Sequence, residues 1–365
     1  MAEESQNIAL IFGASGISGW SLMRECLSHG TKHTFSRVIG LSNRPLSREA
    51  TGIPDDPRLA IHTGLDLTNQ SSTCQKLETI PNIRDVTHVY FRDVVEVNSA
   101  IVDNALVAVN KLCPKLRFGY GAAGHPFPPA PWKEDLPRLP EPFASDIFYY
   151  AQYDVVAKHA AQNSWKWSEI RPSFLVRFVP NGNAMNIAHS LGLYLSFYRS
   201  EMGGSANCVF PGTAESWTPL HTDSFQDLVA RLHIHVSLHP EKSNGRSFNS
   251  GDGKSVSWEM KWPIVCGYFG LTGVGPSATV GGQAHGKEWL IAHKDSWLTW
   301  TKENGLGAKS LDDAWSDILV TSLSMPVRID FDLGASREIG FSESMEPGEG
   351  FLLAFDRLRE AKFLP

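Results

Sequence analysis

The sequence lacks a long apolar run, a basic leader and an excess of positive charge. Among its 365 residues we find no run of about 18 apolar residues, the length that a membrane-spanning helix needs. The first residues, MAEESQ, are acidic, whereas a signal peptide begins with basic residues. The formal net charge is -6, and nucleic acids and anionic membranes are bound through clustered Lys and Arg. We therefore expect a cytoplasmic protein that has neither nucleic acid nor a membrane as its partner.

Cysteines and metal-ligand spacings are scarce as well. The five cysteines are scattered and form no CxxC pair, so we expect free thiols at Cys26, Cys74, Cys113, Cys208 and Cys266. His233, His235 and His239 lie close in sequence, but helical positions two apart do not share a face. No carboxylate or cysteine cluster accompanies them, so we expect no metal. The sequence also has no GxSxG turn, which argues against an α/β-hydrolase.

What the sequence does contain is a regular alternation of strand-like and helix-like segments. Residues 8–12, IALIF, form the continuous apolar run that is typical of a buried parallel strand. Further strands are predicted at residues 37–41, 59–62, 86–90, 116–120 and 167–171. Helical patterns lie between most of them, for example at residues 97–112. Strands that alternate with helices predict an α/β fold with a doubly wound parallel Rossmann sheet.

The alternation fades after residue 180, which predicts two lobes. We expect a dinucleotide-binding Rossmann lobe at residues 1–180, with a strand region returning to it near residues 215–250. A smaller substrate-binding lobe is expected at residues 181–365. Helical patterns recur in this lobe at residues 287–304 and 351–362. The chain has 11 Trp and 19 Phe, enough to fill a core and to line an apolar pocket.

A proline-rich segment interrupts the first lobe. Residues 126–142 contain seven prolines, so they cannot form a helix or a central strand. Long loops in compact domains are usually functional or disordered. We predict an ordered loop over a site.

A glycine-rich turn directly follows the first strand and precedes a helical stretch. Gly13, Gly16 and Gly19 are spaced as GxxGxxG. The first glycine permits the tight turn, the second lets the backbone approach a pyrophosphate, and the third lets helix and strand pack closely. The helix N-terminus then faces the anion. The pattern predicts a dinucleotide site, with Ser15 and Ile17 of the same turn among its contacts.

The end of the second strand distinguishes NAD from NADP. An acidic residue there would bond the ribose 2′-hydroxyl and repel a 2′-phosphate. The sequence instead offers Ser42, Asn43 and Arg44, and a guanidinium suits a phosphate. We therefore predict NADP(H). Asp66 and Leu67, after the third strand, are candidates for binding the adenine through a carboxylate and an apolar face.

Several further segments are distinctive when taken together. They are THVY at residues 87–90, EDLPRL at 134–139, FYY followed by Asp154 at 148–154, WS and RP within 167–172, FN and GD within 248–252, and ENGL at 303–306. With the glycine turn, they resemble the progesterone 5β-reductase/iridoid synthase (PRISE) family of atypical short-chain dehydrogenases over nearly the whole chain. Ile147 and Tyr153 stand where the family has Asn and Glu. The resemblance implies an extended short-chain dehydrogenase fold.

The resemblance also implies a reaction and a catalytic tyrosine. Family members use NADPH to reduce an activated C=C of an enone or enal, and a tyrosine phenol stabilises or protonates the enolate oxygen. Tyr150 matches that tyrosine. The segment with Pro172 and Phe174 would pass under the nicotinamide. Tyr120, which begins the loop after the fifth strand, is also expected to contact the cofactor. The substrate pocket is expected to include Arg92, Ala123, Tyr149 and Phe341.

One position departs from the family pattern. The family brings a lysine beside its tyrosine from the loop after the fifth strand, and Ala123 stands at that position here. In an ordinary short-chain dehydrogenase the lysine lies four residues after the tyrosine, where this chain has Asp154. A nearby ammonium favours the phenolate form of a tyrosine, so its loss makes Tyr150 a poorer acid. His125, two residues after Ala123, is the candidate helper.

Three functions remain open from the sequence. The first is an NADPH-dependent reductase of an activated C=C or a carbonyl in a bulky apolar metabolite. The second is a non-redox isomerase or cyclase that keeps the cofactor as a structural part. The third is an NADP(H)-sensing binding protein, since fold alone does not determine function. We expect a small apolar molecule as the substrate, and a monomer or homodimer.

Overall fold

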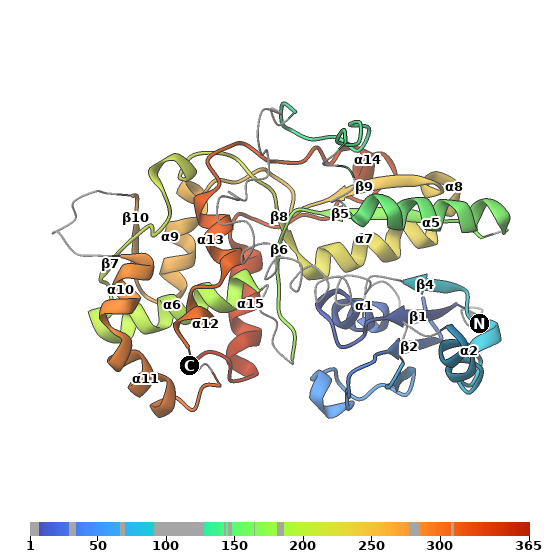
Figure 1. Ribbon diagram of the computed structural model, residues 1–365, viewed down its shortest axis with the longest axis horizontal. Helices are drawn as coiled ribbons and strands as arrows, with labels where there is room; N and C mark the ends of the chain where they lie inside the picture. The colour runs from blue at the N-terminus through green and yellow to red at the C-terminus, as the bar shows by residue number, and fades with distance from the viewer. Residues whose placement is uncertain are drawn as a thin grey trace. The chain divides into compact units, whose positions relative to one another are not determined.

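The computed structural model describes residues 7–28, 34–65, 70–90, 128–141, 144, 148–163, 165–180, 186–276, 285–307 and 310–365. The chain divides into two compact units, Met1–Pro129 and Ala130–Pro365, and each contains a buried hydrophobic cluster of its own. Figure 1 shows the helices and strands of both units. The predicted boundary at residue 180 separates a cofactor lobe from a substrate lobe by function, and it stays a prediction.

The first unit contains a parallel sheet with the strand order β3-β2-β1-β4. Its helices and strands are β1 (Ile8–Phe12), α1 (Ile17–Ser28), β2 (Arg37–Leu41), β3 (Leu59–His62), α2 (Gln70–Glu78) and β4 (His88–Tyr90). All three strand pairings are parallel. This order is that of the first half of a Rossmann sheet, which confirms the predicted fold class. The first three strands have the predicted bounds, and the fourth begins two residues later than predicted.

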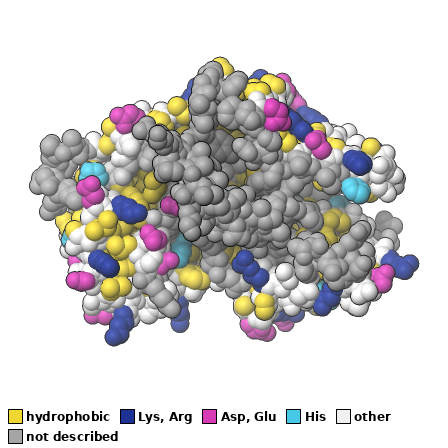
Figure 2. Space-filling view, viewed as in Figure 1, with side chains coloured by type: hydrophobic (Ala, Val, Ile, Leu, Met, Phe, Trp, Pro, Cys, Tyr) yellow, Lys and Arg dark blue, Asp and Glu magenta, His cyan; other side chains and the backbone are white. Residues whose placement is uncertain are grey.

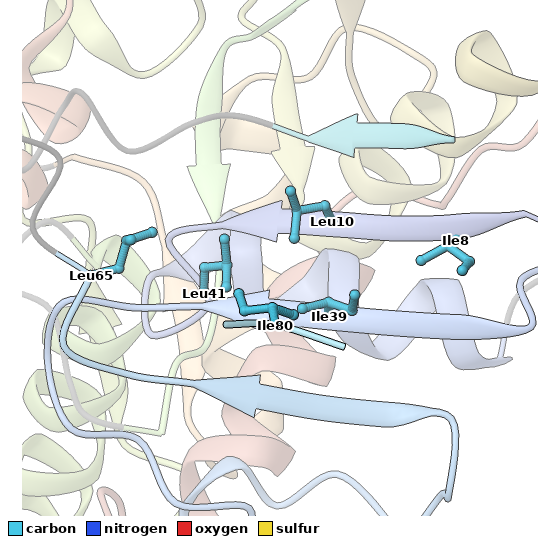
Figure 3. Close-up of a cluster of buried hydrophobic side chains, with 6 residues drawn as sticks. All are labelled: Ile8, Leu10, Ile39, Leu41, Leu65 and Ile80. Atoms are coloured by element: carbon cyan, nitrogen blue, oxygen red, sulfur yellow. The ribbon is translucent and has the colours of Figure 1, made fainter. Parts of the chain in front are cut away.

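Both faces of this sheet are buried, as the apolar runs of its strands predict. On one face, a hydrophobic cluster forms from residues of β1 and β2 and two residues from the loops (Figure 3): Ile8, Leu10, Ile39, Leu41, Leu65 and Ile80. Leu77 of α2 packs against this cluster. On the other face lie Ala9 and Ile11, both fully buried, and Gly40, which contacts Met23 of α1. The two helices therefore cover opposite faces of the sheet.

The second unit contains three parallel strand pairs among its described residues, β5–β9, β6–β8 and β7–β10. Its helices and strands are α5 (Phe148–Gln162), β5 (Ser168–Pro172), β6 (Phe174–Val176), α6 (Ile187–Met202), β7 (Asn207–Val209), β8 (Asp223–Phe225), α7 (Gln226–Leu238), α8 (Pro240–Ser243), β9 (Arg246–Ser250), α9 (Trp258–Tyr268), β10 (Thr272–Val274), α10 (Gly286–Ala292), α11 (Lys294–Glu303), α12 (Leu311–Ala314), α13 (Asp317–Ser324), α14 (Gly334–Glu338) and α15 (Glu349–Glu360).

Most of the predicted elements that can be compared are present, with one interruption. The strand predicted at 167–171 is β5, and the helix predicted at 351–362 is α15. The helix predicted at 287–304 is broken at His293 into α10 and α11. The His293 ring stacks on Trp289 with centroids 4.4 Å apart, and its Nδ1 lies 2.8 Å from the Trp289 carbonyl oxygen. The strand predicted at 116–120 and the helix predicted at 97–112 lie outside the described residues.

Aromatic side chains fill much of the core of the second unit. Trp258, Trp262 and Trp297 are at most 1% exposed, as are Tyr194 and Phe197. Edge-to-face and tilted ring contacts join α6 to α10 and α11, and a second set links Trp258 and Trp262 of α9 to each other and to Phe210. The expected role of the aromatic residues in filling a core is therefore confirmed for these side chains.

The surface in Figure 2 carries mixed charge. On the face in view, the Lys and Arg side chains of the described residues are interspersed with Asp and Glu. This is the usual pattern of a protein surface. Within the described part of the chain, no helix combines the length and the apolar character that crossing a bilayer requires.

Replacement of Gly19 by alanine tests the packing of α1 against the turn that precedes it. An added Cβ would lie 2.1 Å from the carbonyl oxygen of Gly13, so backbone must shift. We expect Gly19→Ala to lower the free energy of unfolding by about 1–3 kcal/mol or more, measured by urea denaturation. Gly267→Ala in α9 is the control, because nothing lies within 4 Å of its added Cβ. A Gly19→Ala variant as stable as the parent would contradict the described contact.

Candidate active site

The glycine turn of the first unit is closely packed. Gly13 has a φ of 75°, in the left-handed region that favours glycine. The Gly16 N–H donates to the Gly13 carbonyl oxygen over 2.8 Å, and the Ala14 N–H donates to Leu41 of β2 over 2.8 Å. Gly19 lies against the backbone of Gly13. The turn therefore connects β1 and α1 without side chains between their backbones.

The residues of this turn fit a dinucleotide diphosphate. The N–H groups in the first turn of α1 have no acceptor within the helix, and the helix dipole adds partial positive charge there. Gly13 and Gly16 present backbone without a Cβ at this point, and Ser15 is half-buried between them. Ile17 begins the helix and is buried. A bound nicotinamide dinucleotide would be held by these backbone N–H groups.

Beyond the end of β2, Ser42 and Arg44 are placed differently. Ser42 is buried, and its hydroxyl donates to the Ser15 Oγ over 2.8 Å, so it supports the turn. Asn43 and Arg44 are exposed. Arg48, the next arginine, donates to backbone oxygens and forms an ion pair with an aspartate. Binding of a 2′-phosphate by Arg44 stays a prediction.

Several predicted site residues lie outside the described part of the chain. They are Asp66, Leu67, Arg92, Tyr120, Ala123 and His125. Their assigned roles stay predictions. Leu65, directly before Asp66, is buried in the cluster of Figure 3.

In the second unit, the segment predicted to pass under the nicotinamide is a fixed bend between two strands. Pro172 ends β5 and pairs with Ser250 of β9, whereas Phe174 begins β6 and pairs with Asp223 of β8. Between them, the Ser173 N–H donates to the Ser224 Oγ over 3.0 Å, and this hydroxyl donates to the Ser250 carbonyl oxygen over 2.8 Å. The change of pairing partner therefore fixes the backbone at this bend.

Helix α5 carries the predicted catalytic tyrosine. Tyr150 is half-buried, and its hydroxyl oxygen accepts a hydrogen bond from the Leu139 N–H over 3.1 Å. The Arg138 guanidinium lies over the Tyr150 ring, 4.8 Å from its centroid. It also forms two hydrogen bonds with Asp154, of 2.9 and 2.6 Å. Tyr149 is 49% exposed, as expected for a helical neighbour that points about 100° away.

The proline-rich loop that supplies Arg138 and Leu139 is anchored to the strands. The Asn249 side chain donates to the carbonyl oxygens of Trp132 and Asp332, over 2.8 and 3.1 Å. The Glu134 carboxylate accepts from the Asn249 N–H over 2.7 Å, and its carbonyl oxygen accepts from the Arg171 guanidinium over 3.1 Å. The loop is thus held to β5 and β9 over its described part.

Similarity to known proteins identifies the family. Residues 9–365 match the PRISE-like Rossmann-fold domain. The chain belongs to the PRISE family. It is 32% identical to the short chain dehydrogenase ausT of Aspergillus calidoustus over 397 residues, which cover 100% of this chain and 96% of the relative. It is 26% identical to the 3-oxo-Delta(4,5)-steroid 5-beta-reductase of Arabidopsis thaliana over 387 residues, which cover 100% of this chain and 95% of the relative.

A solved structure supports the fold of this PRISE protein. The UDP-glucose 4-epimerase from Bifidobacterium longum, in complex with NAD+ and UDP, superposes with a TM-score of 0.56. The identity is 14%, and the match covers 98% of this chain and 99% of the epimerase, so it shows the fold alone. The predicted family and the predicted enzyme class, a short-chain dehydrogenase/reductase, are confirmed. The fold and the family indicate a nicotinamide cofactor.

A cluster of charged and titratable side chains around Lys261 lies next to Phe174. Lys261 is 1% exposed, and its Nζ lies 2.7 and 2.8 Å from the two carboxylate oxygens of Asp223. Burial lowers the pKa of Lys261, while Asp223 opposes this shift. The His221 ring lies edge-on to the Phe174 ring, with the centroids 5.9 Å apart. Its Nε2 lies 3.6 Å from the Oδ1 of Asp223. Burial, aided by Lys261, lowers the pKa of His221 to about 4.

Asp252 belongs to the same cluster. Its carboxylate accepts from the Phe225 N–H over 2.5 Å. Burial raises the pKa of Asp252 to about 7, and the neighbouring carboxylates of Asp223 and Glu349 contribute to this rise. The Phe225 hydrogen bond and the Lys261 charge act in the opposite direction. Asp252 therefore keeps its proton to a higher pH than an ordinary aspartate does.

Phe341 and the three close histidines have structural contacts. Phe341 is buried in a hydrophobic cluster with residues of α7 and β9, so its contact with substrate stays a prediction. His233 and His239 each bring Nδ1 within 2.8 Å of a backbone carbonyl oxygen, and the His235 Nε2 lies 3.0 Å from that of Ile339. Among the described residues, no group of three or more His, Cys, Asp and Glu side chains could hold a metal.

The sequence reasoning missed Arg138 and the charge cluster around Lys261. In the sequence, Arg138 stands out only as part of the EDLPRL motif. The feature that could have pointed to its role is Asp154, an acidic residue one helical turn after Tyr150. The signal for the cluster is a lysine set between the tryptophans of the segment WEMKW, at residues 258–262. A lysine that is fully buried almost always has a paired charge.

Replacement of Asp252 tests the buried cluster through the pH dependence of stability. With a pKa of about 7 when folded and 3.8 as its ordinary value, Asp252 keeps a proton that the unfolded chain releases. Its contribution to stability is therefore lost as the pH rises from about 4 to 7, by up to ~1.4 kcal/mol per pH unit. We expect Asp252→Asn to remove this loss, as measured by urea denaturation across that range.

In the Asp252→Asn variant, His221 should dominate the remaining pH dependence of the free energy of unfolding. Its lowered pKa costs stability as the pH falls from 6.5 towards 4, so the Asp252→Asn protein should gain stability with rising pH there. Asp295→Asn, at an exposed position on α11, is the control and should behave as the parent does. An unchanged pH profile in Asp252→Asn would contradict the proton on Asp252.

Proposed function

We propose that this PRISE protein is an NADP(H)-dependent reductase of an activated C=C, or of a carbonyl, in a bulky apolar metabolite. The observation that carries the proposal is the glycine turn, in which Gly13 and Gly19 bring β1 and α1 together. In this proposal, Arg44, beyond the end of β2, pairs with the 2′-phosphate of NADP(H). The Arabidopsis relative is named as a reductase of a 3-oxo-Delta(4,5)-steroid, an enone of this class.

In the proposed reaction, NADPH held at this site would supply a hydride to the β-carbon of the activated double bond and become NADP+, and the displaced π electrons would collect on the substrate oxygen as an enolate. Tyr150 is the acid on the oxygen side. Its O–H bond breaks, the proton forms an O–H bond on the substrate oxygen, and the electron pair stays on the phenolate oxygen. The Leu139 N–H already donates to that oxygen, so the hydroxyl hydrogen remains available for the substrate. The phenolate then regains a proton from solvent, and His125 is the proposed helper.

A second candidate function is favoured by Ala123, which stands where the family has lysine. An isomerase or cyclase would use the same pocket and keep the cofactor as a structural part. A third candidate, an NADP(H)-sensing binding protein, would bind the cofactor without converting any small molecule. All three share the dinucleotide site. Only the reductase consumes the cofactor, and only the sensor converts no small molecule.

Calorimetric titration with NADPH and NADP+ tests the cofactor proposal first. An absorbance assay for loss of NADPH, with a panel of small and steroid-sized enones, then tests the reaction. Binding with turnover supports the reductase. Binding without turnover on any activated enone favours the isomerase, cyclase or sensor, and no binding contradicts the cofactor site.

Replacement of Arg44 tests NADP preference. We expect Arg44→Ala to weaken NADPH binding about tenfold or more and NADH binding little, because only NADPH carries the 2′-phosphate that a guanidinium pairs with. Calorimetry with both cofactors measures the two affinities. Arg37→Ala, at the opposite end of β2, is the control. An equal loss for both cofactors in Arg44→Ala would show that the phosphate is not bound there.

Replacement of Tyr150 tests the proposed acid. Removal of a general acid typically costs a factor of about 10²–10⁴, so we expect Tyr150→Phe to lower kcat by that amount. Tyr268→Phe, on α9 and outside every predicted site position, is the control and should lose far less. Steady-state rates with the best enone of the panel measure both. An unchanged rate in Tyr150→Phe would remove this tyrosine from the mechanism.

A further inference from the structure

We infer that Arg138 of the proline-rich loop is the positioning residue whose cation stabilises the Tyr150 phenolate during proton transfer. The inference rests on the proposed function, because it assigns a partner to the acid proposed there. It supplies the positive charge that Ala123 cannot. The observation behind it is that consecutive residues, Arg138 and Leu139, contact the ring and the oxygen of the same tyrosine.

The guanidinium is held in one place by three side chains of α5. It lies 4.8 Å from the ring centroid of Tyr150 and 5.4 Å from that of Tyr153. Asp154 fixes it from the same helix with two hydrogen bonds, in the paired geometry that an arginine fork favours. Positions 150 and 154 are one turn apart and share a helix face. Asp154 thus places a cation on the tyrosine's own face of the helix.

The loop backbone adds a second group at the reacting oxygen. The Leu139 N–H donates to the Tyr150 hydroxyl oxygen over 3.1 Å. A hydrogen bond from an N–H becomes stronger when its acceptor becomes an anion. When the Tyr150 proton leaves for the substrate oxygen, the electron pair remains on the phenolate, whose oxygen contacts this N–H and whose ring faces the guanidinium. Both groups are therefore better matched to the phenolate than to the phenol.

Arg138 takes no part in the proton transfer itself. A guanidinium keeps its charge at any working pH, so it acts only through the charge that it places beside Tyr150. The side chains that contact the Arg138 guanidinium include those of Tyr150, Tyr153 and Asp154. A purely structural tie between the loop and α5 is the competing explanation for the same contacts, and the test has to separate the two.

Arg138→Met and Arg138→Lys, in the full-length protein with NADPH and the best enone, make this separation. We expect kcat to fall about tenfold or more in Arg138→Met with little change in the KM for NADPH. Arg138→Lys should recover a large part of the loss, because it restores the charge without the fork. Arg246→Met is the matched control: Arg246 is similarly exposed, pairs with Glu338 over 3.0 Å, and lies over the Phe248 ring at 5.1 Å.

A titration that needs no turnover gives the second readout. The ultraviolet absorbance of tyrosinate, taken as the difference between each protein and its Tyr150→Phe counterpart, follows the Tyr150 phenolate alone. In Arg138→Met this absorbance should appear at a higher pH than in the protein that keeps Arg138. Arg246→Met should leave it unchanged.

The outcomes separate the two proposals. An Arg138→Met protein that loses activity without a change in the tyrosinate titration, and that Arg138→Lys does not restore, would overturn the inference in favour of a structural tie. If the parent protein reduces no enone, the proposed function fails. The titration then still decides whether Arg138 stabilises the Tyr150 phenolate.

Discussion

The close contact between Gly13 and Gly19 sets the geometry of the first unit. A Cβ at Gly19 would lie 2.1 Å from the Gly13 carbonyl oxygen, so β1 and α1 meet backbone to backbone. This contact directs the N-terminus of α1 towards the turn, where it can receive an anion. The adjacent β2 adapts to the same helix, since Gly40 leaves room for Met23 and Ser42 reaches Ser15. The dinucleotide site thus follows from how tightly one helix can approach one sheet.

In the second unit, the proline-rich loop places Arg138 and Leu139 against the side chains of α5. Its described part is tied to β9 through Asn249 and reaches α5 through Arg138 and Leu139. The residues that made the family recognisable, in the segments EDLPRL and FN, are those that make these ties. They explain why a proline-rich segment is ordered here: side-chain and backbone hydrogen bonds replace the ladder that prolines cannot form.

The sequence predicted elements with strong local patterns and missed contacts between distant residues. The apolar run of β1 and the GxxGxxG turn have a local physical cause, and both are found where predicted. The break at His293 depends on stacking against Trp289, which no period in the sequence shows. Lys261 pairs with Asp223, 38 residues away, and Arg138 meets Asp154 only because the loop folds back on α5. Such pairs depend on the tertiary fold and not on local propensity.

In the proposed reaction, this PRISE protein transfers a hydride to an activated substrate although Ala123 replaces the family lysine. Mass spectrometry of the products formed with NADPH deuterated at its transferable position detects that transfer. We expect one deuterium in each molecule of reduced enone, at the carbon that receives the hydride. A product of unchanged mass, isomeric with the substrate and free of deuterium, would contradict it.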